Sequence, residues 1–203
     1  MSDDKPSLWR SRLKLIAVIA CFAVPYGGAT LYFQNVKQGG IFASKANGVL
    51  LEPAVPLGEF DQGALGDKAP VDETGLQRHW TLVYFNDGAC DAACEERLYF
   101  SRQVRVMLGR EMYRVRRLLV SDTEPTEALQ EEHVQLLYAG ADADGDGLRT
   151  RVSNAVGDEV FSTPGQFYLV DPFGNLMMRF PADIPAKSML KDIKVLLKAS
   201  RIG

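Results

Sequence analysis

WTLVYFNDGACDAACEERLYFSR, residues 80–102, is the stretch that decides the fold. Residues 82–85 are apolar and rich in the aromatic and β-branched types that favour a strand. A polar turn at 86–89 leads to Cys90 and Cys94 at the start of a predicted helix. The free N–H groups and the dipole there stabilise a negative group such as a thiolate. Cysteines four residues apart on one helix face can share a metal or, with some bending, form a disulfide.

Length and composition predict one globular domain with appendages. The chain has 203 residues, of which 46% are hydrophobic and 24% charged, as in a protein with a real core. Its net charge of -3, without a basic aromatic groove, argues against nucleic acid as a partner. Of the three cysteines, Cys21 lies in an apolar N-terminal run, so Cys90 and Cys94 belong together.

The N-terminus predicts a transmembrane helix. Residues 1–14 include Lys5, Arg10, Arg12 and Lys14, whereas residues 15–33 contain no charged side chain. At ~1.5 Å per residue that uncharged run approaches the ~30 Å of a bilayer core. The basic side stays in the cytoplasm, so we expect a cytoplasmic segment at 1–14, an anchor at 15–33 and the remainder outside. Disulfides are permitted in that environment.

Two other interpretations of the N-terminus remain open. A cleaved signal peptide would need a small-residue cleavage site, and 26–29 is a poor one. A lipoprotein signal ending at Cys21 would have a very short apolar core, and the chain stays apolar after it. The uncleaved anchor is the preferred interpretation, with Cys21 as a small apolar residue.

The rest of the chain predicts a tether and extension at 34–75 and a domain at 76–203. Residues 34–75 are rich in glycine, proline and acidic residues, with short apolar pieces that suggest edge strands or a hairpin. In the domain, apolar runs predict strands at 80–85, 113–120, 133–138, 165–170 and 175–180. Helices are predicted from the cysteines to Gly109, at 123–132 and at 185–200, where four lysines lie largely off the apolar face. This order gives an α/β fold with a mixed central sheet flanked by helices.

That order, with cysteines after the first core strand, resembles a thioredoxin-like fold and, within it, the Sco/SenC family. The matching features are residues 80–85, the Cys90-x-x-x-Cys94 pair, the hairpin at 168–174 and the N-terminal anchor. Segments 102–105 and 114–117 resemble a divergent branch, and the whole likeness covers about residues 45–200. It implies a single-pass protein of the bacterial inner membrane with a periplasmic domain, which handles copper in cytochrome c oxidase assembly. Its partners would be a respiratory oxidase subunit or another assembly factor.

One departure from the family is plain in the sequence. A Sco protein completes its copper site with a histidine just before the hairpin strand, but residues 160–166 contain none. The chain's two histidines, His79 and His133, are expected to point elsewhere, so the copper ligands carry over only as Cys90 and Cys94. Pro164, after Thr163, resembles the cis-proline that packs beside a thioredoxin cysteine pair. The alternative is a trans proline that starts an edge strand.

Three roles are open for the cysteine pair. A passive disulfide over so short a loop would add little stability. Two thiolates suit Cu(I), a soft ion that accepts two or three ligands. As a redox pair, one thiolate attacks a disulfide and the other resolves it. Asp91, Glu95 and Glu96 oppose a thiolate, and Arg97 is the one nearby cation in sequence, so no unusually acidic cysteine is expected.

Two further patterns have ordinary explanations. Residues 142–147 match the first half of an EF-hand loop, but Ser153 stands at the twelfth place, so a solvated acidic loop is preferred to a calcium site. The seven arginines between 97 and 117 predict an exposed basic face, with docking to acidic lipid or an acidic partner as the weaker hypothesis.

We therefore expect a membrane-anchored Sco-like factor that assists cytochrome c oxidase assembly through Cu(I) handling or thiol–disulfide exchange. The alternatives are a non-catalytic assembly partner and a general thiol–disulfide oxidoreductase without copper. Whether the chain is an enzyme is left open.

Overall fold

The computed structural model describes residues 8–38, 46–58, 61–62, 71–72, 76–140 and 147–200. The chain divides into two compact units, Met1–Lys45 and Ala46–Gly203.

The first unit contains one long helix, α1 (Leu8–Gln38), with Pro25 inside it. From Leu15 to Tyr26 its large apolar side chains are exposed; Ile16 and Phe22, for example, are 61% and 77% exposed. The predicted anchor at 15–33 lies within this helix. Among the residues that the structure describes, no helix has both the length and the apolar character needed to cross a membrane.

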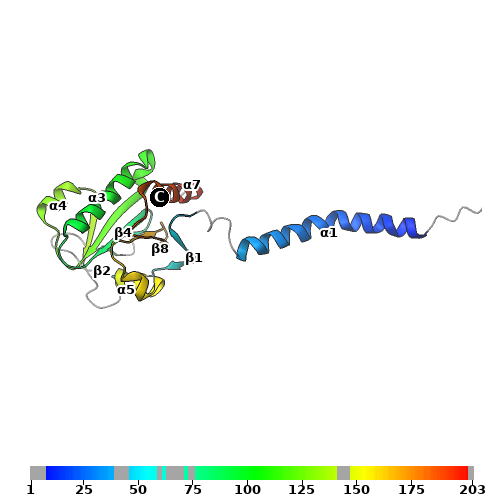
Figure 1. The fold of residues 1–203 in the computed structure, drawn as a ribbon, viewed down its shortest axis with the longest axis horizontal. Helices are drawn as coiled ribbons and strands as arrows, with labels where there is room; N and C mark the ends of the chain where they lie inside the picture. The colour runs from blue at the N-terminus through cyan, green and yellow to red at the C-terminus, as the bar shows by residue number, and fades with distance from the viewer. Residues whose placement is uncertain are drawn as a thin grey trace, which may run out of the picture. The chain divides into compact units, whose positions relative to one another are not determined.

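The second unit is built on a six-stranded mixed sheet (Figure 1). Its strands, in spatial order, are β1 (Val49–Pro56), β8 (Asn175–Phe180), β7 (Phe167–Val170), β4 (Trp80–Asn86), β5 (Val115–Ser121) and β6 (Leu136–Gly140). β4, β5 and β6 run parallel, while β7 pairs antiparallel with both β4 and β8, and β1 antiparallel with β8. The short strands β2 (Asp61–Gln62) and β3 (Val71–Asp72) form a separate pair. The predicted mixed sheet is confirmed.

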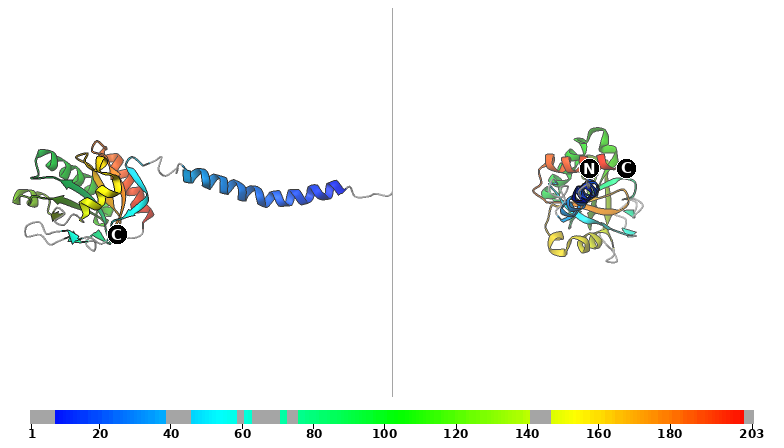
Figure 2. Two further views of the ribbon diagram at one scale, coloured as in Figure 1. Left: turned by 90° about the horizontal axis from the view of Figure 1, so that it is seen from below. Right: turned by 90° about the vertical axis from the view of Figure 1, so that its right-hand side faces the viewer.

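Helices cover both faces of the sheet because side chains of the central strands alternate between two cores. Leu82 and Tyr84 of β4 pack with α3 (Ala92–Val106) and α7 (Ala186–Ala199), whereas Val83 packs on the opposite face with α5 (Leu148–Val156). α6 (Asp158–Phe161) adds Phe161 to that second core. The right-hand view of Figure 2 shows the sheet between these two layers.

The predicted order of elements holds, with one omission. The helix from the cysteines, the helix at 123–132 and the closing helix correspond to α3, α4 (Glu127–Glu132) and α7. A 3-10 helix, η2 (Gly109–Arg114), links α3 to β5. Residues 148–161, which carried no predicted element, form α5 and α6. Their apolar spacing is short and lies among polar residues, so it gives only a weak helical pattern.

The sheet extends into the stretch predicted as an extension. β1 pairs with β8 at both of its ends, through Val49 and Leu50 and through Val55 and Pro56, with an irregularity between Leu50 and Val55. Just before β1, Gly48 lies so close to the Phe180 ring that an added Cβ would come within 2.6 Å of it. The compact unit therefore includes residues from Ala46 onward.

Arg117 is a buried cation with weak partners. It is 3% exposed on β5, beneath α3, and its Nη1 donates to Leu98 O at 3.2 Å and Ser101 Oγ at 3.4 Å. Its Nε has no hydrogen-bond acceptor. Burial, with the nearby Arg105 and Arg102, lowers the pKa of Arg117 to about 10. The folded state thus carries an unfavourable charge at this position.

We predict that Arg117→Met leaves the free energy of unfolding unchanged or raises it by about 1–2 kcal/mol, because an apolar side chain of similar length replaces a poorly compensated charge. Arg117→Ala, which leaves a cavity, is the matched control and should lower it. Chemical denaturation of the solubilised chain measures both. A loss of more than about 2 kcal/mol in Arg117→Met would show that the charge stabilises the fold.

Candidate functional site

The cysteine pair lies between the end of β4 and the first turn of α3. β4 ends at Asn86, and Asp91 is the N-cap of α3, with its carboxylate accepting from the Cys94 N–H at 3.0 Å. Cys90 therefore precedes the helix and Cys94 lies in its first turn. A disulfide joins them, with 5.1 Å between their Cα atoms. The sulfurs are adjacent as the spacing predicts, although only Cys94 is helical.

The two cysteines differ in their access to solvent. Cys90 is partly exposed, whereas Cys94 is 1% exposed and belongs to the core beneath α3. A molecule that approaches from solvent therefore meets the Cys90 sulfur first. Cys94 also contributes to the lining of a pocket of about 440 Å³.

The pocket lies between the start of α3 and the segment before β7. Aromatic side chains from β4, α6 and β7 form part of its wall, and polar groups form much of the remainder. Its lining comprises Tyr84, Phe85, Asn86, Asp87, Asp91, Ala93, Cys94, Arg149, Phe161, Ser162, Thr163, Pro164, Gly165, Gln166 and Tyr168. The mixture suits a segment of polypeptide with an apolar side chain and backbone groups to hydrogen-bond.

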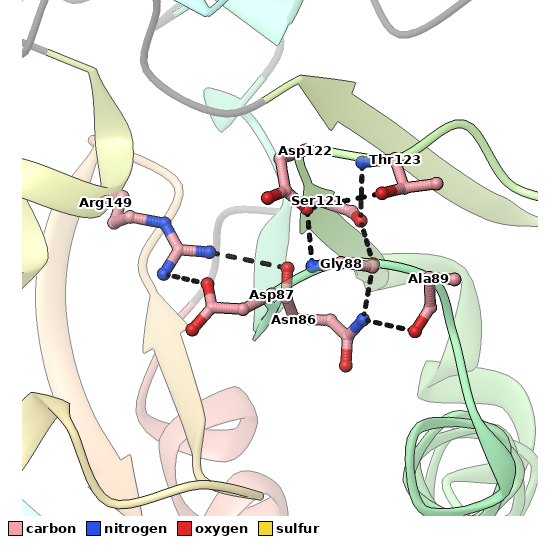
Figure 3. Close-up of polar contacts among 8 residues, drawn as sticks. All are labelled: Asn86, Asp87, Gly88, Ala89, Ser121, Asp122, Thr123 and Arg149. Carbon is pink, nitrogen blue, oxygen red and sulfur yellow. Dashed lines mark hydrogen bonds and ion pairs between the residues drawn. The ribbon is translucent and has the colours of Figure 1, made fainter.

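Hydrogen bonds from the last residues of β4 and β5, and from Asp122 just after β5, fix the loop that leads to Cys90 (Figure 3). The Gly88 N–H donates to Asp122 Oδ1 at 2.5 Å, and Gly88 O accepts from Ser121 Oγ at 3.2 Å and from Asn86 Nδ2 at 3.0 Å. Gly88 has φ of 74°, which favours glycine. Because both backbone groups of Gly88 have partners, the loop holds one path from β4 to Cys90.

Arg149 of α5 holds the same loop from the other side. Its Nη1 lies 2.7 Å from Asp87 Oδ1, and its Nη2 donates to Asn86 O at 3.4 Å (Figure 3). Its guanidinium also lies over the rings of Phe85 and Phe161, 5.4 and 5.8 Å from their centroids. Arg149 was not among the predicted site residues, because no helix was predicted at α5. The spacing of Leu148 and Val152 is the signal that was available.

Arg97, the cation nearest the cysteines in sequence, is directed toward aromatic rings. It lies 4.6 Å from the centroids of both Phe100 and Phe167 and donates to Ala182 O at 2.9 Å. Burial raises the pKa of Tyr84, and the positive charge of Arg97 offsets part of this increase. The Asp91 carboxylate accepts the Cys94 N–H, and its negative charge opposes a thiolate there.

Residues 161–166, where the resemblance to the family would place a histidine, line the same pocket as Cys94. Gln166, 3% exposed, fixes the segment: its Nε2 donates to Val160 O and Thr163 O, and its Oε1 accepts from Arg179. No histidine is present there. The one cis peptide of the described residues is Glu52–Pro53, so the bond to Pro164 is trans and the cis alternative is wrong.

Neither histidine of the chain lines the pocket. His79 precedes β4, at the opposite end of that strand from the cysteines, and His133 is buried after α4. Across the described ranges, no three or more His, Cys, Asp or Glu side chains gather in a group that could hold a metal. Two sulfurs remain as the soft donors suited to Cu(I).

The two secondary patterns from the sequence have different outcomes. Most of the calcium-like loop, 141–146, lies outside the described residues, and Ser153 donates to Asp158 Oδ1. The arginines do not form one exposed face. Arg105 and Arg114 donate to backbone carbonyls, Arg117 is buried, and Arg97 stacks on rings.

Comparison with known proteins places this fold. Residues 80–200, more than half of the chain, match the family model described as transmembrane-like, thioredoxin-like, C-terminal domain. The chain belongs to this family. No curated protein matches the chain in sequence.

Solved structures of Sco proteins share the fold of this family member. Apo Sco1 from Thermus thermophilus aligns with a TM-score of 0.58 at 18% identity, over 75% of this chain and 97% of that one. Copper-bound yeast Sco1 aligns with a TM-score of 0.52 at 18% identity, over 70% of this chain and 92% of that one. BsSco aligns with a TM-score of 0.53 at 14% identity, over 72% of this chain and 96% of that one. It is described as a member of the Sco family of cytochrome c oxidase assembly proteins with a disulfide switch. The predicted Sco-like, thioredoxin-like fold is confirmed.

The buried histidine makes stability depend on pH. Burial lowers the pKa of His133, and Arg117 lowers it further. Between the unfolded value of about 6.5 and the lower folded value, the unfolded chain binds more protons, so stability falls as pH falls. We predict that the free energy of unfolding decreases from pH 7 to pH 5 and that His133→Gln reduces this dependence.

The matched control is His79→Gln. The pKa of His79 is also lowered by burial and by Arg116, but His79 is more exposed, so this variant should change the dependence less. Denaturation curves at several pH values give the slopes. An unaltered slope in His133→Gln would contradict the prediction.

Proposed function

We propose that this chain is a membrane-anchored factor that assists cytochrome c oxidase assembly by thiol–disulfide exchange at Cys90 and Cys94. One observation carries the proposal: a disulfide joins a partly exposed sulfur to a buried one that lines a pocket. This asymmetry suits an attacking cysteine and a resolving cysteine.

The exchange begins with both cysteines reduced. The Cys90 thiolate attacks one sulfur of a client disulfide, forms a mixed disulfide and releases the first client thiolate. The Cys94 thiolate then attacks the Cys90 sulfur and releases the second client thiolate. The client gains two electrons and the pair becomes a disulfide. An external dithiol reductant must restore the thiols by the reverse exchange.

A purely structural disulfide is the weaker interpretation. The bridge spans a sequence separation of four residues, so it removes little entropy from the unfolded chain. The Asp91 N-cap and the Gly88 contacts already fix the loop and the helix start without it. A bridge that adds little stability and leaves Cys90 partly exposed is better suited to chemistry.

Cu(I) carriage is the second candidate, with the ion as cargo. Two adjacent sulfurs match the soft ligands that Cu(I) accepts, and copper-bound yeast Sco1 shares the fold. The segment at 160–166 contributes no histidine, so the client would supply a third ligand. Mass spectrometry of the reduced chain after Cu(I) loading tests this candidate. One bound copper that Cys90→Ser abolishes would support it.

The membrane anchor of the proposal rests on residues 15–33. This stretch has no charged residue and follows a basic segment, and the large apolar side chains of α1 from Leu15 to Tyr26 are exposed. Exposed apolar groups on several sides of one helix favour a surrounding lipid phase. The positive-inside rule then puts the domain in the periplasm, where an oxidase subunit or another assembly factor is the partner.

We predict that Cys94→Ser traps a mixed disulfide between Cys90 and the client, because the resolving thiol is lost. Cys90→Ser should trap far less, since Cys94 is only 1% exposed whereas Cys90 is partly exposed. Non-reducing electrophoresis and mass spectrometry of membrane fractions measure the adducts and identify the client.

The double variant Cys90→Ser, Cys94→Ser is the control for chemistry. Loss of oxidase activity in cells with this variant, at an unchanged level of the protein, supports exchange or copper carriage. Full oxidase assembly would instead assign the chain to a non-catalytic partner role. Trapping of proteins unrelated to the oxidase would favour a general oxidoreductase.

A further inference from the structure

The outer face of α7 carries a stripe of lysines. At ~100° per residue these side chains fall within roughly 60° of the helix circumference. The lysine stripe consists of Lys187, Lys191, Lys194 and Lys198, all exposed. With Leu190 and Val195 they line a shallow groove. Within the described part of the chain, no ion pair joins a carboxylate to any of the four.

Folding of the domain does not account for the lysine stripe. The opposite face of α7 buries Met189, Ile193 and Leu197 in the core shared with α3. Neighbours three and four residues apart on one helix face repel when their charges are alike. Asp192, the one acidic residue of α7, is buried and does not neutralise them. Four exposed lysines with no ion pair among the described residues favour the approach of an anionic surface.

The buried Asp192 fixes the beginning of the domain to the same helix. Its Oδ2 accepts from the Asn47 N–H at 2.7 Å and the Gly48 N–H at 2.8 Å, and its Oδ1 accepts from Asn47 Nδ2 at 2.9 Å. Asp192 lies about a third of a turn around α7 from the lysine stripe. The chain therefore joins the second unit beside this stripe.

The chain length keeps this point close to the end of α1. α1 ends at Gln38 and the second unit begins at Ala46, so residues 39–45 make the connection. Seven residues span at most ~25 Å whatever path they take. With α1 inserted in a membrane, Asn47 follows Gln38 by nine residues and so lies no farther than ~32 Å from the end of α1. α7, ~21 Å long, is thereby held within reach of the headgroups.

We propose that the lysine stripe binds the anionic phospholipid headgroups of the membrane that holds α1. This inference rests on the anchor of the proposed function. Charge complementarity and the short connection favour lipid over an acidic protein, because the connection makes the headgroups the surface of highest local concentration. Val195, 55% exposed beside the stripe, adds an apolar contact at the surface. Docking would orient the domain, and with it the cysteine pair, relative to the bilayer.

Energy transfer in lipid nanodiscs tests the proposal. The chain has two tryptophans, so Trp9→Phe leaves Trp80 of β4 as the sole donor, with dansyl-labelled lipid headgroups as acceptors. Discs of phosphatidylcholine alone are compared with discs that also contain phosphatidylglycerol. We expect more transfer in the anionic discs and a loss of the increase at high salt. Each lysine is worth roughly a fivefold change in the docking equilibrium.

The decisive variant changes all four lysines to glutamine, and the matched control changes them to arginine. The increase in transfer should disappear with glutamine and persist with arginine. Equal transfer in both kinds of disc would overturn the proposal and leave the stripe for an acidic protein. An increase that persists with glutamine would overturn the assignment to α7. Release of the chain from the discs by an alkaline wash would contradict the membrane anchor of the proposed function. Client trapping by Cys94→Ser tests the exchange chemistry independently of lipid binding.

Discussion

The burial of β4 between two cores is the constraint on which the rest of the domain depends. Trp80 to Tyr84 are all buried, with a parallel neighbour on one side and an antiparallel one on the other. A strand fixed in this way ends at a defined position, Asn86, and the loop that follows it contains Cys90. The site is precise because a rigid strand precedes the loop and a capped helix follows it.

The position of the helix N-cap gives the two sulfurs different chemistry. Asp91 lies between the cysteines and takes the Cys94 N–H, so Cys90 remains outside the helix. A cysteine in a loop at the surface and one in a buried helical turn have unlike access, although they are bonded to each other. The carboxylate at the cap also adds negative charge beside the pair, which opposes ionisation of the thiols.

The sequence predicted the sheet, the position of the cysteines and the closing helix because each has a strong local pattern. The run at 82–85 and the 3.6-residue period of α7 needed no tertiary information. α5 and α6 were missed because they are short and their stability comes from packing on β5 and β7. Arg149 was missed with them, since its contact with Asp87 joins residues far apart in the chain. The trans bond at Pro164 could not be predicted, because a Thr-Pro dipeptide fits either isomer.

The pairing of β1 with β8 has a consequence for how the domain can be divided. β1 covers the hydrogen-bonding edge of β8, and Asn47 and Gly48 satisfy the buried carboxylate of Asp192. A fragment cut at residue 76 would leave an open strand edge, which invites association with other chains. It would also leave an unpaired carboxylate in the interior. A soluble fragment for crystallisation should therefore start at or before Ala46.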